Sequence, residues 1–290
     1  MNMRRLLISV LLLTAGLAFA QPGQPHFEVV SIKPCKAEDQ NHSHISAGRL
    51  THECISLDHL IREVYVSFAD GITPPSHALQ ALRSQKFKGA PPWIAAERFT
   101  INAKADGLST QFMMQGPMLR PVLEDRFQLK IHREPREIPI YELVVSGTPK
   151  LTPSKPGACI ELDPVKGPPT REKGQSAPPL VCGGSFYRND RIGGLDHRSA
   201  TMQDLCILYS FSAERDVIDK THLTGRYDLH LDGLTFDDVL PRPQTTPGDA
   251  PANPVSALNS ALRKLGLKLQ PSKMTADFIV IDHVERPTQN

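Results

Sequence analysis

The sequence predicts an α+β fold built from two tandem copies of one small module. Three observations lead to this prediction. Two segments align with each other without a gap, each contains a helical pattern of apolar residues, and each helix is followed by an alternating pattern. GRLTHECISLDHLIREV aligns with GGLDHRSATMQDLCILY, and such self-similarity indicates a duplicated structural unit. The aligned pairs are Gly48 and Gly193, Leu50 and Leu195, His52 and His197, Ser56 and Thr201, and Leu60 and Leu205.

A short strand is expected to lead into a helix in each copy. Ser56 and Thr201 are suited to cap these helices, because their side-chain oxygens can accept from free amides of the first turn. Apolar residues then recur at helical spacing, which predicts one buried face on each helix. These residues are Leu57, Leu60, Ile61 and Val64 in the first copy and Met202, Leu205, Cys206 and Tyr209 in the second.

Strands are expected to follow each helix. The alternating segment that begins at Arg98 corresponds to the one that begins at Arg226, and alternation is typical of a half-buried antiparallel strand. A further helix and two more strands close each copy, and the last strands cover 140–145 and 278–281. Each half should be roughly βαββ followed by αββ, with antiparallel or mixed sheets and helices packed on one face.

The first 20 residues have the pattern of a signal peptide. Basic residues precede the apolar run LLISVLLLTAGL, and AFA, which ends at Ala20, has the form of a cleavage site. The apolar run is shorter than the roughly 20 residues that span a bilayer. We therefore expect a soluble exported protein, periplasmic or extracellular, with no membrane anchor.

The proposed repeats divide the rest of the chain. Residues 21–152 are expected to form the first α+β repeat and residues 183–290 the second. Between them, the Pro-rich residues 153–182 are expected to form a loop or linker, and a second Pro-rich insertion covers 241–254.

Five cysteines are present, an odd number for an oxidising compartment. Cys159 and Cys182 flank the Pro-rich loop, so we expect a disulfide to close it and to contribute roughly 3 kcal/mol. A redox pair is the alternative, but neither a C-x-x-C motif nor a helix start that would lower a thiol pKa is visible. Cys54 and Cys206 lie among apolar neighbours and are expected to be small buried residues, whereas Cys35 has no assigned role.

Charge and motifs exclude several classes of function. The net charge is +2, from 33 basic and 31 acidic residues, which gives no electrostatic reason to expect nucleic acid as a partner. The sequence contains no H-E-x-x-H, G-x-S-x-G, P-loop or G-x-G-x-x-G motif. The common metallopeptidases, α/β-hydrolases, P-loop enzymes and dinucleotide-binding enzymes are therefore not indicated, and we expect no cofactor.

Histidines supply the candidates for a metal or catalytic site. His42, His44 and His52 are candidate metal ligands, because two histidines two positions apart on an extended strand can share a divalent ion. The alternative is a solvated loop between the first strand and the first helix. His132, beside Arg133 and Glu134, is a candidate acid/base group, and its alternative is an ion pair facing solvent at a strand end.

Several segments occur in an order that resembles a known family. They are FEVVSIKP, SLDHLIREVY, GAPPWIAAERFTINAKA, LEDRFQLKIHRE with IPIYELVVSG, VIDKTHLTGRYDLHLDG, and LGLKLQ followed by IVIDHVERP. Together they are similar to the soil-associated protein family of acidobacteria, exported proteins built on a domain of unknown function. This resemblance implies no established activity and no catalytic residues. Similar domains attached to membrane metallopeptidases of the beta-lactam-sensor type imply a sensing or ligand-binding role.

A second, more distant likeness concerns one supersecondary unit. The segment VIDKTHLTGRYDL and the helix before it resemble the N-terminal interaction domain of secretins and TonB-dependent receptors, which implies a protein-interaction role. We therefore expect a non-catalytic protein that binds, senses or interacts with a protein, peptide or small-molecule ligand in the cell envelope. A secreted hydrolase that uses His132, or His42 and His44, is one alternative. An inhibitor of exported peptidases, based on the Pro-rich loop, is another.

The polar stretch DKTHLTGRYDLHLDGL is interpreted as a turn and a strand rather than as a site. Its counterpart in the first copy lacks most of its polar groups, and Gly225 can supply a positive φ before the strand. Leu229 should then face the core and His230 the solvent. We expect Leu229→Ala to lower the free energy of unfolding by about 2–5 kcal/mol, and His230→Ala to leave it nearly unchanged. Chemical denaturation of both variants tests this, and the reverse order of effects would overturn the register.

Overall fold

The computed structural model describes most of the chain. The described residues are 25–35, 42–46, 48–73, 77–161, 180–188, 193–234 and 254–287. The expected signal peptide, residues 1–20, lies outside these ranges, as do most of the Pro-rich loop and nearly all of the insertion at 241–254. Within the described ranges, no helix combines the length and the apolar character needed to cross a membrane.

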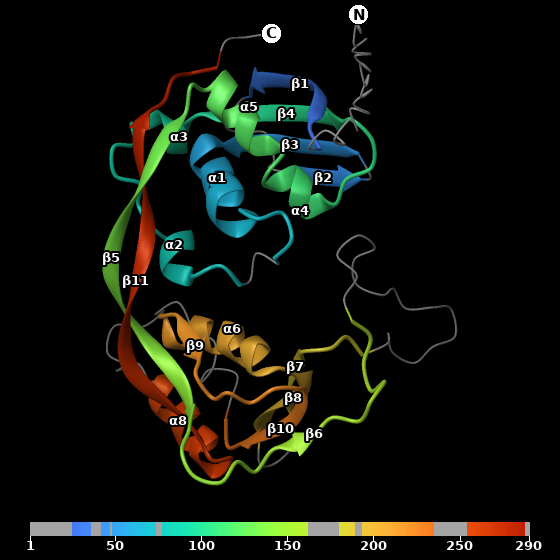
Figure 1. Cartoon of the computed structure of the whole chain (residues 1–290), viewed down its shortest axis with the longest axis vertical. Coiled ribbons are helices and arrows are strands. Elements are labelled where there is room, and N and C mark those ends of the chain that lie inside the picture. The colour runs from blue at the N-terminus through green and yellow to red at the C-terminus, as the bar shows by residue number, and fades with distance from the viewer. Residues whose placement is uncertain are drawn as a thin grey trace, which may run out of the picture.

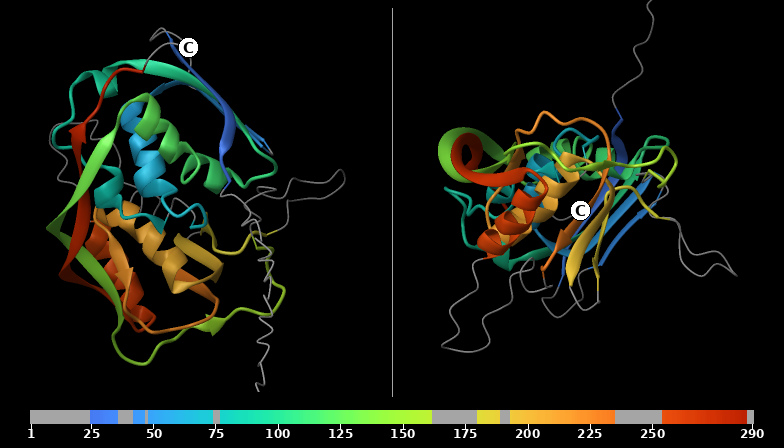
Figure 2. Two further views of the ribbon diagram at one scale, coloured as in Figure 1. Left: turned by 45° about the horizontal axis from the view of Figure 1, so that its top comes forward. Right: turned by 90° about the horizontal axis from the view of Figure 1, so that it is seen from below.

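Two lobes lie one above the other, and a long two-stranded ribbon runs along one side of both (Figure 1). Each lobe contains a four-stranded sheet, with strand order β1-β4-β3-β2 in the first lobe and β6-β10-β8-β7 in the second. Figure 2 shows the ribbon from two further directions, nearly end-on in the right-hand view. Helices and antiparallel sheets occupy separate layers, so the predicted α+β class is confirmed.

The sheet of the first lobe is antiparallel. Its strands are β1 (Phe27–Pro34), β2 (His42–Ser46), β3 (Arg49–Ser56) and β4 (Arg98–Ala105). Along β4, Phe99, Ile101 and Ala103 are buried, and the residues between them are more exposed. This is the alternation that the sequence predicts for the strand at Arg98.

The helices of the first lobe are short. They are α1 (Leu57–Arg62), the π-helical turn η1 (Glu63–Ser67), α2 (Gln80–Arg83), α3 (Trp93–Ala96), α4 (Gln111–Gln115) and α5 (Leu119–Arg126). Ser56 caps α1 as predicted, because its hydroxyl accepts a hydrogen bond from the His59 amide at 3.3 Å. The four residues predicted to form the apolar face are all buried.

The second lobe combines its four-stranded sheet with longer helices. Its elements are β6 (Thr152–Pro153), β7 (Gly184–Arg188), β8 (Gly194–Ala200), α6 (Met202–Ala213), β10 (Tyr227–Asp232) and α8 (Pro254–Lys264). Thr201 caps α6 in a capping box with Asp204, in which each residue's side chain accepts from the backbone amide of the other. On β10, Leu229 is buried and His230 is exposed, as predicted.

The ribbon consists of β5 (Lys130–Val145) and β11 (Leu267–His283), each of which is one continuous strand. The prediction of two separate strands after each closing helix is therefore wrong. The two strands pair with each other along their length, and β9 (Val217–Asp219) adds to β5 in parallel. Pro135 and Pro139 do not interrupt β5, because alternate residues of a two-stranded ribbon need no amide donor toward the partner strand.

The ribbon completes the cores of both lobes. Leu143 of β5 and Leu269 of β11 are buried in the core of the second lobe, whereas Ile279 and Ile281 of β11 are buried in the core of the first. Each expected repeat thus contributes a strand to the core of the other lobe. The tandem duplication itself stays a prediction.

A buried carboxylate also links the lobes. Asp216, which lies between α6 and β9, accepts hydrogen bonds from the backbone amides of Gln80 and Ala81 at the start of α2. The residue at the N-cap position, Leu79, has no side chain that could do this. Because Asp216 is only 4% exposed, it caps α2 from the opposite lobe in a site shielded from water.

Replacing Asp216 tests this contact. Asp216→Ala leaves the amides of Gln80 and Ala81 without their acceptor, so we expect the free energy of unfolding to fall by about 1–2 kcal/mol. Asp216→Asn retains an oxygen acceptor and should lose less. Denaturant unfolding measures both variants, and hydrogen exchange at Gln80 and Ala81 locates the effect. Unchanged exchange at these two amides in Asp216→Ala would contradict the assignment.

Candidate functional site

A pocket lies beside a bulge in β8 of the second lobe. The pairing of β8 with β10 shifts register between Tyr227 and Leu229, and Ser199 adopts a positive φ of 47°. The Ser199 amide donates to Asp228 Oδ1 at 2.8 Å, and the Ser199 carbonyl accepts from Arg226 Nη1 at 2.8 Å. The bulge therefore fixes the arginine side chain that precedes β10.

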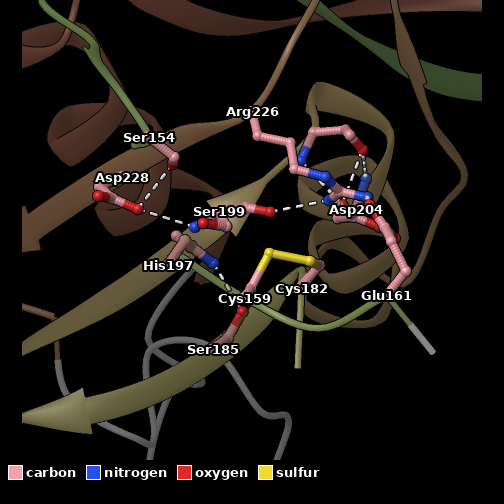
Figure 3. Close-up of polar contacts among 11 residues, drawn as sticks. Ser154, Cys159, Glu161, Cys182, Ser185, His197, Ser199, Asp204, Arg226 and Asp228 are labelled. Atoms are coloured by element: carbon pink, nitrogen blue, oxygen red, sulfur yellow. Dashed lines mark hydrogen bonds and ion pairs between the residues drawn. A yellow bond between two sulfur atoms is a disulfide. The ribbon is translucent and has the colours of Figure 1, made fainter. Parts of the chain in front are cut away.

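The guanidinium group of Arg226 has one end fixed by the fold and the other held by a surface residue (Figure 3). Nη1 contacts the Ser199 carbonyl and lies 3.5 Å from Asp204 Oδ2. Nη2 donates to both carboxylate oxygens of Glu161, at 2.6 and 2.8 Å. The Glu161 side chain is 72% exposed, whereas that of Arg226 is 30% exposed. Gly225, just before Arg226, has the expected positive φ, 100°.

The pocket in front of Arg226 has a volume of about 370 Å³. Residues 154–159 form one wall, Glu161 and the Cys159–Cys182 disulfide lie at its side, and Ser199 and Arg226 line the rest. The disulfide is the pair that the sequence indicates. A backbone bridge between Ile160 and Val181 also ties this wall to the start of β7. The wall is thus held in place by covalent and backbone links rather than by a large core.

The first lobe has the same backbone geometry with different side chains. Cys54, with a φ of 51°, stands where Ser199 stands in the second lobe, and its carbonyl accepts from Arg98 Nη1 at 3.2 Å. The Cys54 amide donates to Thr100 Oγ1 at 3.4 Å. A disulfide joins Cys54 to Cys35, which directly follows β1. In the first lobe, the bulge is therefore bonded covalently to the end of the edge strand.

Hydrogen bonds take the place of this disulfide in the second lobe. The Ser154 amide donates to the Arg226 carbonyl at 3.0 Å, as the Cys35 amide donates to the Arg98 carbonyl at 3.1 Å. Ser154 therefore occupies the position of Cys35. Its hydroxyl donates to Asp228 Oδ1 at 2.8 Å, the same oxygen that accepts from the Ser199 amide. Polar groups thus stand where the first lobe has a cystine.

The Cys35–Cys54 disulfide corrects the interpretation of Cys54 as an unpaired buried residue. Cys54 is indeed buried, at 2% exposed, but it is bonded. The sequence does not show this pair, because β4 lies between the strands that carry the two cysteines. Cys206 is a free, buried thiol on α6, and burial raises its pKa.

A family model matches residues 77–284, a segment that contains Arg98, Arg226 and the whole described wall of the pocket. Its description is a protein of unknown function, DUF3738. The chain belongs to this family. No curated protein and no solved structure matches the chain. The site in this DUF3738 chain is therefore argued from its own geometry.

A buried histidine in the first lobe of this DUF3738 chain contacts a serine and an acid. His52 Nδ1 lies 2.7 Å from Ser43 Oγ, and His52 Nε2 lies 3.3 Å from Glu63 Oε2. Burial raises the pKa of Glu63 to about 8 and lowers the pKa of His52 to about 4, so both are uncharged at neutral pH. A protonated Glu63 facing Nε2 favours the tautomer in which Nδ1–H donates to Ser43. A general base needs a free lone pair toward the serine, so this arrangement does not activate Ser43.

The second lobe contains a matching buried histidine. His197 Nδ1 lies 2.7 Å from Ser185 Oγ, and its Nε2 lies 3.0 Å from the hydroxyl of Tyr209. Burial lowers the pKa of His197 to about 4. Tyr209 takes the place that Glu63 has in the first lobe, so the acidic partner is not shared by the two lobes. The common part is a neutral histidine that bonds neighbouring strands, which is a structural role.

The three histidines proposed as metal ligands do not converge. His42 and His44 lie on β2, which is a strand rather than the alternative loop. His52 pairs with Ser43 in register, so its side chain points to the opposite face from His42 and His44. Within the described ranges, no group of three or more His, Cys, Asp or Glu side chains could hold a metal ion.

His132 lies inside β5 rather than at the end of a strand. Its Nδ1 is 2.7 Å from Asp282 Oδ1, and its Nε2 is 3.6 Å from Glu134 Oε1. Hydrogen bonds from Lys88 and Arg136 lower the pKa of Glu134 to about 2. The His132 side chain is about half exposed, so this group is an ion-pair network facing solvent, which contributes little to stability.

Two partners of Arg226, Asp204 and Glu161, were not predicted from the sequence. The capping-box spacing from Thr201 is a signal that could have assigned Asp204 to the start of α6. Glu161 follows Cys159 by two positions, which places it beside the expected disulfide. Its partner lies 65 residues away, and no local pattern indicates that contact.

Burial of Glu63, His52 and His197 predicts a stability maximum near pH 6.5. The folded-state pKa of Glu63 is raised from 4.5, so the fold holds a proton that the unfolded chain releases, and stability falls as pH rises toward 8. The pKa values of His52 and His197 are lowered from 6.5, so stability falls as pH drops from 6.5 toward 4. Between pH 6.5 and 8 the loss from Glu63 should be about 2 kcal/mol.

Urea denaturation from pH 4 to 9 measures this profile. We expect Glu63→Gln to remove most of the loss above pH 6.5 and to keep the loss on the acid side. A wild-type protein equally stable at pH 6.5 and pH 8 would show that Glu63 ionises normally in the fold.

Proposed function

We propose that this DUF3738 chain is an exported, non-catalytic binding protein whose ligand occupies the pocket at Arg226. The observation that carries the proposal is a guanidinium group with one nitrogen fixed by Ser199 and the other directed at a pocket of about 370 Å³. Ligand pockets typically enclose roughly 300–1,000 Å³ and contain a few placed polar groups. Arginine supplies a charged planar donor that orients a ligand.

The walls of the pocket are fixed by bonds within the fold, which favours binding. The Cys159–Cys182 disulfide holds one wall, and Asp228 ties Ser154 to the bulge at Ser199. A site already held in its bound shape loses less conformational entropy when a ligand enters.

Both disulfides support export, because such bonds persist in oxidising compartments. The expected signal peptide and the resemblance to exported soil-associated proteins of acidobacteria support the same location. The distant likeness to secretin and TonB-receptor domains supports a role in binding over one in catalysis. We accordingly expect the ligand among the proteins, peptides and small molecules of the cell envelope.

The positions of the histidines favour binding over hydrolysis. His132 lies on the ribbon, and His42 and His44 lie in the first lobe, so none of them lines the pocket at Arg226. The Pro-rich segment on which an inhibitor role was based lies mostly outside the described residues.

A fragment screen followed by NMR tests the proposal. We expect bound fragments to shift the amide resonances of residues 154–159 and Ser199, and Arg226→Gln to weaken binding at least about tenfold, or about 1.4 kcal/mol. Arg98→Gln is the matched control, because it removes the same bond to a bulge carbonyl in the first lobe. Fragments that bind Arg226→Gln as tightly as the wild type, or a screen with no shifts at the pocket, would contradict the proposal.

A further inference from the structure

The contact between Glu161 and Arg226 differs from a two-nitrogen arginine–carboxylate pair. Both oxygens of Glu161 accept from the single nitrogen Nη2, because Nη1 is occupied by the Ser199 carbonyl. Elsewhere on the surface, Glu97 accepts from both Nε and Nη2 of Arg286. Glu161 therefore contacts a nitrogen of Arg226 that the bond to Ser199 does not use.

Glu161 is also easier to remove from its partner than a buried acid would be. Its side chain is mostly exposed, and exposed ion pairs contribute little to stability. The carboxylate can thus leave Arg226 without unfolding the site, whereas the bond from Nη1 to Ser199 keeps the guanidinium in place.

The charges around the pocket favour another anion once Glu161 leaves. Among the described residues that line it, Lys155 and Arg226 are basic and Glu161 is acidic. Asp204 and Asp228 do not line the pocket, and they already accept hydrogen bonds: Asp204 from Thr201, and Asp228 from Ser154 and Ser199. Without Glu161, the described residues that line the pocket would include two cations and no acid.

We propose that Glu161 is an internal placeholder for a ligand carboxylate, so that the pocket binds molecules with a free carboxylate group by exchange with Glu161. This inference rests on the proposed binding function. A carboxylate is the group that Nη2 already accommodates, and a single negative charge matches the one it replaces. A phosphate dianion would bring a second negative charge toward Asp204, which lies 3.5 Å from Nη1.

The pocket is larger than a carboxylate group alone requires. Its volume of about 370 Å³ leaves room for a small organic acid or for the last residues of a peptide. Both ligands present the same carboxylate to Arg226, and they differ in the groups that would contact residues 154–159.

NMR titration with defined probes tests the exchange. Propionate represents free organic acids with a single carboxylate, N-acetyl-alanyl-alanine represents a peptide C-terminus, and the amide of that dipeptide lacks the carboxylate. We expect Glu161→Gln to bind a carboxylate probe roughly fivefold to tenfold more tightly than the wild type, because the internal competitor is removed. Glu97→Gln removes the same charge from another exposed arginine pair and should bind like the wild type.

Each outcome has a defined meaning. Tighter binding of propionate or of the dipeptide acid by Glu161→Gln alone supports the exchange and identifies the preferred source, provided that the amide does not bind. Equal affinity in the wild type and Glu161→Gln overturns the placeholder role. If carboxylates bind no variant while other fragments still shift the pocket amides, the inference fails and the proposed binding function stands. If no probe or fragment shifts these amides, both fail.

Discussion

Backbone pairing between β5 and β11 is the interaction on which the rest of the structure depends. It joins residues near the middle of the chain to residues near its end along the full length of both strands. β11 supplies buried side chains to both cores, whereas β5 supplies buried Leu143 to the second lobe and half-buried Ile131 to the first, so neither core is complete without the ribbon. The segment that forms the pocket wall follows β5 directly through β6. The position of the candidate site is therefore set by the ribbon.

The two lobes use one backbone arrangement for different purposes. In both, a residue with positive φ presents its carbonyl to an arginine at the start of the next strand. The first lobe closes this point with the Cys35–Cys54 disulfide, which fixes the edge strand covalently. The second lobe uses Ser154 and Asp228 instead and moves its disulfide outward to the pocket wall. The bond between a bulge carbonyl and an arginine thus stabilises both lobes. In the second lobe the arginine, Arg226, also lines a pocket.

Local patterns in the sequence were sufficient for the parts of the fold that depend on near neighbours. Ser56 and Thr201 cap their helices, and Leu229 faces the core, because capping and alternation involve residues a few positions apart. The continuous strands were missed because their partners lie in the other half of the chain. The Cys35–Cys54 disulfide and the contact of Glu161 with Arg226 were missed for the same reason. In both cases the partners lie on segments that only the fold brings together.

The candidate site was predicted only in part. Arg226 was recognised as the counterpart of Arg98, and the disulfide beside it was expected, yet the polar stretch was interpreted as a turn and a strand. That interpretation holds for the backbone and for Leu229 and His230. The interpretation did not include the pocket in front of Arg226. The surroundings of the Arg226 side chain depend on the segment 154–161 and not on the sequence of β10.

The ribbon also determines the order in which the chain can finish folding. β5 contains 16 residues and is synthesised well before β11, so it has no ribbon partner until the C-terminal segment follows. An unpaired strand of this length can pair with other chains and aggregate. The middle of β5 carries Arg133, Glu134, Arg136 and Glu137 together with Pro135 and Pro139. Charges and prolines oppose such edge-to-edge pairing, so the central sequence of β5 protects the nascent chain until its last strand arrives.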